Sequence, residues 1–137
     1  MTTSSVSRTS PAPEHRLTVW AGGLIIGIVG LHILVFAFHP YWGDWLTGGL
    51  HSHAADESLV IFWALPGGFV VPMALLGGIV IHLGRARRPV PGYTGVALLL
   101  WALACVGLIG VSGFITAVAP AILLVLAHLL HRKHSRS

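Results

Sequence analysis

The sequence predicts an all-α fold: a polytopic bundle of four transmembrane helices, with the N- and C-termini both in the cytoplasm. Four apolar segments are expected to cross the membrane, at about 17–38, 59–83, 93–114 and 115–130. A helix of about 20 apolar residues spans a hydrocarbon core roughly 30 Å thick, and the first three segments reach that length. The chain is also 55% hydrophobic and only 9% charged, well below the roughly 25% of charged residues in soluble domains.

The basic residues supply an independent argument for membrane insertion. All eight lie on one side of the four-span arrangement: in the N-terminal tail, between the second and third segments, and after the fourth. The loop between the first two segments has none, and it carries Asp44, Asp56 and Glu57. Because short basic loops stay in the cytoplasm, this pattern predicts both the orientation and contact between the cytoplasmic face and anionic lipid headgroups. No separate basic domain exists that could hold a nucleic acid.

The first element is a tail, 1–16, that is rich in Ser, Thr and Pro and is expected to be disordered. The membrane domain then runs over 17–131, and a basic tail, 132–137, ends the chain. The first span is longer than the roughly 7–15 apolar residues of a signal peptide and ends in Phe36-Ala37-Phe38, so it is expected to be retained. A strong preference for Arg over Lys is typical of GC-rich bacterial genomes, which favours a multi-pass protein of the bacterial inner membrane.

The outer loop and the second span follow. Tyr41, Trp42 and Trp45 open the loop, and such side chains favour the headgroup region. We therefore expect the stretch Pro40–Leu50 to lie along the outer membrane surface. Pro66 and Pro72 interrupt the second segment, where each can kink a helix. Broken helices can line substrate sites in transporters, but kinked packing helices are commoner.

Glycines at helical spacing occur in the first three spans. Gly23 and Gly27 lie four residues apart in the first span, and Gly30 follows one turn later. Small residues let helix backbones approach closely in lipid. The simplest interpretation is close packing within the four helices. The alternative is a homodimer formed through Gly23 and Gly27.

His32 lies well inside a span, in the outer half of the first segment. A polar side chain in a membrane normally faces other helices and suggests a function. We predict a polar notch open to the outside, with His32 at its floor, Glu57 at its rim and Trp63 along one wall. In the alternative arrangement His32 bonds to a backbone carbonyl of the second or third segment, and Glu57 is solvated.

Two cofactor hypotheses come from the other histidines. His51, His53 and Asp56 in the outer loop could bind zinc or another transition metal. Their spacing matches no established ligand set, and the preferred interpretation is a polar start to the second helix, with Asp56 or Ser52 near the N-cap. His82 and His128 lie at similar depths and could hold a haem between them. We expect no metal, no cofactor and no catalytic residue.

Several reaction classes are excluded by missing motifs. The sequence has no glycine-rich phosphate loop with a lysine and no Gly-x-Ser-x-Gly nucleophile. The first span lacks the carboxylate that small four-span multidrug exporters use, and a single cysteine, Cys105, cannot support disulfide exchange within the chain.

Three short stretches carry a family resemblance. They are Gly30-Leu31-His32-Ile33-Leu34-Val35, the run from Glu57 to Trp63 with Pro66-Gly67-Gly68-Phe69, and Val111-Ser112-Gly113-Phe114. From about Trp20 to Leu130 the chain resembles a family of small four-span bacterial integral membrane proteins, a domain of unknown function. The resemblance implies the fold and draws attention to His32, Glu57, Phe62 and Trp63, whereas His51 and His53 fall outside its pattern. It implies no activity.

The sequence therefore favours a non-enzymatic integral membrane protein, with an accessory or small-solute-handling role. One alternative is a small membrane protein that binds a redox group, a metal or haem. Another is a minimal dimeric transporter.

Overall fold

The computed structural model describes residues 12–48, 56–110 and 113–136, and the regular elements in those ranges are all helices. In chain order they are α1 (Pro13–Phe36), α2 (Tyr41–Leu46), α4 (Asp56–Ala64), α5 (Val70–Arg85), α6 (Gly92–Ile109), the 3₁₀-helix η1 (Gly113–Ala117) and α7 (Val118–His134). The predicted all-α class is confirmed for this part of the chain.

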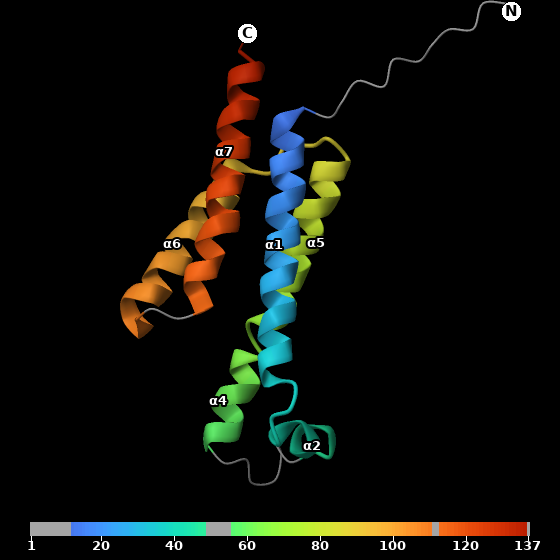
Figure 1. Ribbon diagram of the computed structural model, residues 1–137, viewed down its shortest axis with the longest axis vertical. Helices are drawn as coiled ribbons and strands as arrows, with labels where there is room; N and C mark the ends of the chain where they lie inside the picture. The colour runs from blue at the N-terminus through green and yellow to red at the C-terminus, as the bar shows by residue number, and fades with distance from the viewer. Residues whose placement is uncertain (1–11, 49–55, 111–112, 137) are drawn as a thin grey trace, which may run out of the picture.

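Helix α1 is the centre of the arrangement. It packs along α5 on one side and along α7 on the other, and α6 packs against α7 (Figure 1). The long helices therefore form a row in the order α5, α1, α7, α6. The short helices α2 and α4 lie at the end of the molecule where α1 finishes, and α7 ends at the opposite end, where α1 begins (Figure 1).

The buried core lies at the interfaces that α1 makes with α5 and α7, and it continues between α7 and α6, where Leu98 and Ala102 of α6 are buried. Ala21 and Ile25 on α1 are fully buried, as is Ala121 on α7, and Val80 on α5 is nearly so. The remaining surface of these helices is largely apolar and exposed.

Helix α1 begins earlier than expected. The structure places residues 13–16 in the helix rather than in the tail. Pro13 occupies the first turn, where its missing N–H is not needed, and Glu14 beside it is favoured by the positive end of the helix. The first element is thus 24 residues long.

The second segment is two helices instead of one. A turn over Leu65–Phe69 separates α4 from α5. Pro66 cannot donate a backbone hydrogen bond, so the helical ladder stops there. The amide of Gly67 instead reaches the carbonyl oxygen of Phe62 at 2.9 Å. Pro72 lies in the first turn of α5, where proline is tolerated, and it causes no break.

Glycines bring α1 and α5 into close contact, but Gly23 and Gly27, which were expected to pack between helices, are not among them. A Cβ atom on Gly22 would lie 2.8 Å from the carbonyl oxygen of Gly77, and one on Gly84 would lie 2.8 Å from Val19 Cγ2. By contrast, a Cβ atom on Gly23 or Gly27 would meet nothing within 4 Å. The packing interpretation is therefore wrong for these two positions, which lie on an open face of α1.

The last two segments also differ in their bounds. Helix α6 ends at Ile109, because Gly110 adopts a φ of +88° and leaves the helix. The next helical stretch starts at Gly113 and extends to His134, beyond the expected end.

Two helical stretches are long and apolar enough to cross a membrane, namely Pro13–Phe36 and Gly113–His134. Val70–Arg85 and Gly92–Leu108 are apolar but shorter. Length and composition thus identify two candidate spans in the described residues. The four-span arrangement additionally requires α5 and α6 to cross.

Candidate functional site

His32 forms a hydrogen bond with a backbone carbonyl at the break in the second segment. Its Nε2 atom lies 3.1 Å from the carbonyl oxygen of Ala64, the last residue of α4. In a continuous helix this carbonyl would accept from the amide of Gly68, but Gly68 lies in the turn. Because a carbonyl only accepts, Nε2 must carry the proton. The imidazole therefore supplies the donor that the broken helix lacks.

Aromatic contacts fix the imidazole in place. The ring of His32 lies 5.2 Å from that of Phe36, one turn along α1, and 5.3 Å from that of Phe69, in the turn before α5. Phe69 in turn stacks on Trp101 of α6 at 5.7 Å. His32 thus belongs to an aromatic cluster that joins α1, the break and α6.

Two tryptophans of α2 fasten it to its neighbours. The indole N–H of Trp42 donates to the carbonyl oxygen of Phe36 at 2.8 Å, which caps the end of α1. The indole N–H of Trp45 donates to the hydroxyl of Ser58 on α4 at 3.0 Å, and Ser58 is buried. Within the stretch expected to lie along the outer membrane surface, Tyr41–Leu46 form a short helix that ties α1 to α4.

A tyrosine of the same helix holds Glu57. The hydroxyl of Tyr41 donates to Glu57 Oε2 at 3.0 Å. This hydrogen bond raises the pKa of Tyr41; desolvation and the negative charges of Glu57 and Asp44 act in the same direction.

The three residues of the predicted notch have separate contacts. His32 bonds to Ala64, Glu57 bonds to Tyr41, and the ring of Trp63 lies 5.8 Å from that of Phe62. Trp63 is 59% exposed. A bond from His32 to a backbone carbonyl of the second segment is the contact of the alternative arrangement. The notch that would unite all three residues stays a prediction.

The two cofactor hypotheses gain no geometric support. His51, His53 and the side chain of Asp56 lie outside the described residues. Among the side chains that the structure does describe, no three His, Cys, Asp or Glu residues converge as a metal site would require. His82 and His128 are carried by α5 and α7, which lie on opposite sides of α1 (Figure 1).

Positive charge gathers at the end where α1 begins and α7 finishes. The two helix ends meet there, with Glu14 Oε2 3.8 Å from His134 Nδ1. The cations near that end are Arg16, Arg85, Arg87, Arg88, Arg132, Lys133 and Arg136. Asp44 and Glu57 are carried by α2 and α4 at the opposite end (Figure 1).

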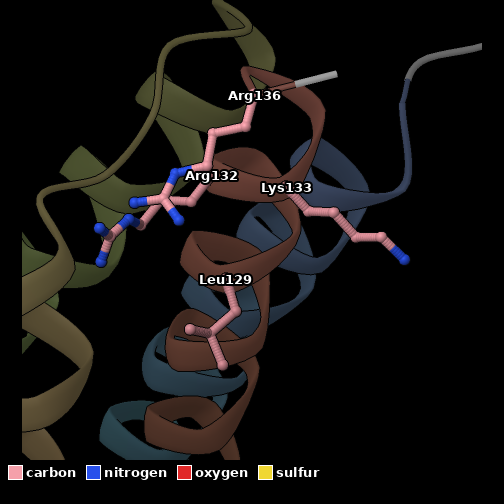
Figure 2. Close-up of a pocket in the computed structure, with 4 residues that line it drawn as sticks. All are labelled: Leu129, Arg132, Lys133 and Arg136. Carbon is pink, nitrogen blue, oxygen red and sulfur yellow. The ribbon is translucent and has the colours of Figure 1, made fainter.

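Two of the surface cavities at this end are lined by cations. One, of about 430 Å³, lies beside the last turn of α7 and is lined by Leu129, Arg132, Lys133 and Arg136. Figure 2 shows Arg132 and Arg136 extending to the same side of α7, while Lys133 points the other way. The other, of about 340 Å³, lies between α1 and α5 and includes Arg16, Arg85 and Arg87.

A third, smaller cavity is lined by the carboxylate of Glu14, which the sequence analysis did not identify as a buried residue. Its volume is about 10 Å³, comparable to one water molecule, and it lies among Glu14, Thr18, His128 and His131. Glu14 is only 6% exposed, and its buried Oε2 accepts no hydrogen bond within the described residues. Pro13 and Glu14 directly before the apolar run were the available sign that the helix starts here.

No known family model matches this chain, and neither a curated protein nor a solved structure is significantly similar to it, so the family resemblance drawn from three motifs stays an expectation.

Proposed function

We propose that the chain is a non-enzymatic integral membrane protein of the bacterial inner membrane, with four spans and both termini in the cytoplasm. Its role would be that of an accessory or small-solute-handling component. The observation that carries the proposal is the distribution of charge along the long axis of the molecule. The basic residues lie near helix termini at one end of the molecule. The acidic and aromatic residues of α2 and α4 lie at the opposite end of the molecule.

Exposed apolar side chains support a lipid environment. Each long helix exposes large apolar residues, among them Leu34 on α1, Leu75 on α5, Leu100 on α6 and Leu129 on α7. Soluble monomers rarely expose continuous apolar surface on this scale. In a bilayer the same surface would face acyl chains without cost.

The broken second segment can still complete a crossing. Helix α5 has 16 residues, which corresponds to about 24 Å and falls short of a core roughly 30 Å thick. The turn and part of α4 would supply the rest. Unpaired backbone groups are costly in lipid, and the donation from His32 to Ala64 reduces that cost at the break.

A minimal dimeric transporter is the second candidate, because two observations favour it. A discontinuous helix with a polar side chain at its break is typical of transporter substrate sites. Gly23 and Gly27 also lie on a face of α1 that no other part of the described chain covers. This candidate shares the membrane arrangement with the first and adds a partner copy.

Reporter fusions test the membrane arrangement. A reporter fused after Ser137 is expected to be active only in the cytoplasm, and one inserted near Thr47 only outside. Insertion after Arg88 provides an internal control, which should behave like the C-terminal fusion. An external C-terminus, or a cytoplasmic Thr47, would contradict the proposal.

A further inference from the structure

The cavity between α1 and α5 concentrates positive charge without a counterion. Arg16, Arg85 and Arg87 line its walls, together with His15, and no carboxylate is among the residues that the structure places there. Three guanidinium groups around one cavity repel one another. An anion in the cavity would relieve that repulsion.

The backbone fixes two of these arginines relative to each other. Gly84 precedes Arg85 and allows α5 to approach α1 so closely that a Cβ atom there would lie 2.8 Å from Val19 Cγ2. Val19 itself lies three residues after Arg16. The same Cβ atom would lie 3.1 Å from the backbone nitrogen of Val19, so the spacing of the two helix ends is limited by backbone atoms as well as by the Val19 side chain.

Arg87 has an unfavourable backbone conformation. Its φ is +54°, and it is the one non-glycine residue with positive φ in the described chain. It ends α5 in the position that glycine normally occupies, with the amide of Arg88 bonded to the carbonyl oxygen of Leu83 at 2.9 Å. Glycine would suit this turn better, so the arginine stands there against the backbone preference. Such outliers point to a role for the side chain.

The rim of the cavity is apolar on the side that faces the middle of α1. Trp20 lines it and is 66% exposed. Leu24, one turn further along α1 on the same face, is exposed as well. A phosphate among the arginines would thus lie beside the apolar surface that Trp20 and Leu24 form along α1. This arrangement suits a ligand with acyl chains better than free phosphate.

We propose that this cavity binds the phosphate of an anionic phospholipid headgroup, with Arg16, Arg85 and Arg87 as its ligands and Trp20 against the glycerol and upper acyl region. The proposal deepens the proposed function and rests on its membrane placement. Basic pockets between helices on the cytoplasmic side of membrane proteins bind such headgroups, and guanidinium groups pair with phosphate in a bidentate manner.

The test measures lipid binding to the full chain purified in an uncharged detergent. Short-chain phosphatidylglycerol and phosphatidylcholine are titrated separately, and the dissociation constants are compared. We expect tighter binding of phosphatidylglycerol. Arg87→Gly should weaken it about tenfold, the value of one charge-assisted hydrogen bond, without lowering the thermal stability, since glycine relieves the backbone conformation.

Arg88→Gly is the matched control, because it removes the same charge one residue away, outside the cavity. It should change the dissociation constant by less than about twofold. Equal losses in the two variants would indicate diffuse surface attraction and overturn the site, as would equal affinity of the wild-type chain for the two lipids. Arg16→Gln should repeat the effect of Arg87→Gly from the α1 side.

Competition with inorganic phosphate distinguishes a lipid headgroup from free phosphate as the ligand of the cavity. Millimolar phosphate should not displace phosphatidylglycerol, and displacement would assign the cavity to free phosphate and overturn the lipid proposal. Binding in detergent does not depend on which end faces the cytoplasm. The binding assay and the reporter fusions can therefore fail independently.

Discussion

The imidazole of His32 and the carbonyl oxygen of Ala64 are 3.1 Å apart and connect the first segment to the break in the second. Replacement His32→Phe keeps the ring contacts with Phe36 and Phe69 but removes the donor. We expect the free energy of unfolding in detergent to fall by about 1 kcal/mol, the typical net value of one hydrogen bond.

The conservative variant His32→Gln tests whether the donor is what matters. Its amide N–H₂ can reach the same carbonyl, so it should lose less stability than His32→Phe. If the order is reversed, ring packing rather than the hydrogen bond explains the position of His32. Chemical or thermal unfolding followed by circular dichroism gives both values.

Neighbouring glycines on α1 should respond oppositely to the same substitution. Gly22→Ala places a Cβ atom 2.8 Å from the carbonyl oxygen of Gly77, a backbone atom that cannot move aside. It should destabilise the protein by about 1–3 kcal/mol. Gly23→Ala meets nothing within 4 Å and should stabilise the helix by roughly 0.5–1 kcal/mol. Similar effects at both positions would mean that α1 and α5 do not pack as described.

The all-α class was predicted correctly, because long apolar segments favour helices. Of the four predicted spans, two are helices long and apolar enough to cross a membrane in the described residues. The two prolines of the second segment predicted that its helix could be kinked, but not that it would divide into two helices, and the sequence does not say which proline acts. Pro66 interrupts an established ladder, whereas Pro72 lies in the first turn of α5, where no intrahelical donor is needed. That difference depends on where the new helix starts.

The partners of polar residues were harder to predict. The position of His32 along the first segment was evident from the sequence, but its acceptor, the carbonyl of Ala64, became available only because the helix α4 ends there. Glu14 was assigned to the tail because Ser, Thr and Pro surround it in sequence. It is buried because the end of α7 returns to the start of α1, and no local pattern encodes that tertiary contact.

The open glycines of α1 predict a dimer that one substitution should weaken. Gly27 has free space around it within the chain, so Gly27→Leu should leave the monomer folded. The added side chain would prevent close approach of two copies of α1. Energy transfer between labelled chains in liposomes is expected to decrease relative to the wild-type chain.

Gly107→Leu is the matched control for the dimer, since Gly107 on α6 is equally open. It should leave energy transfer unchanged. Absence of transfer in the wild-type chain, or equal losses in the two variants, would exclude α1 as the dimer interface.

Tyr41 should titrate above the ordinary tyrosine pKa of about 10, because its hydroxyl donates to Glu57 and ionisation would break that bond. The neutral form is favoured in the folded protein, so the contact contributes fully below the unfolded pKa and is lost as the pH rises through the folded pKa. Tyrosinate absorbance reports this titration in a Tyr93→Phe background. Glu57→Gln should return the pKa of Tyr41 toward its ordinary value. Asp44→Asn should lower it less, because Asp44 makes the smallest contribution. If Glu57→Gln left the titration unchanged, the contact that holds α2 to α4 through Tyr41 would be absent in solution.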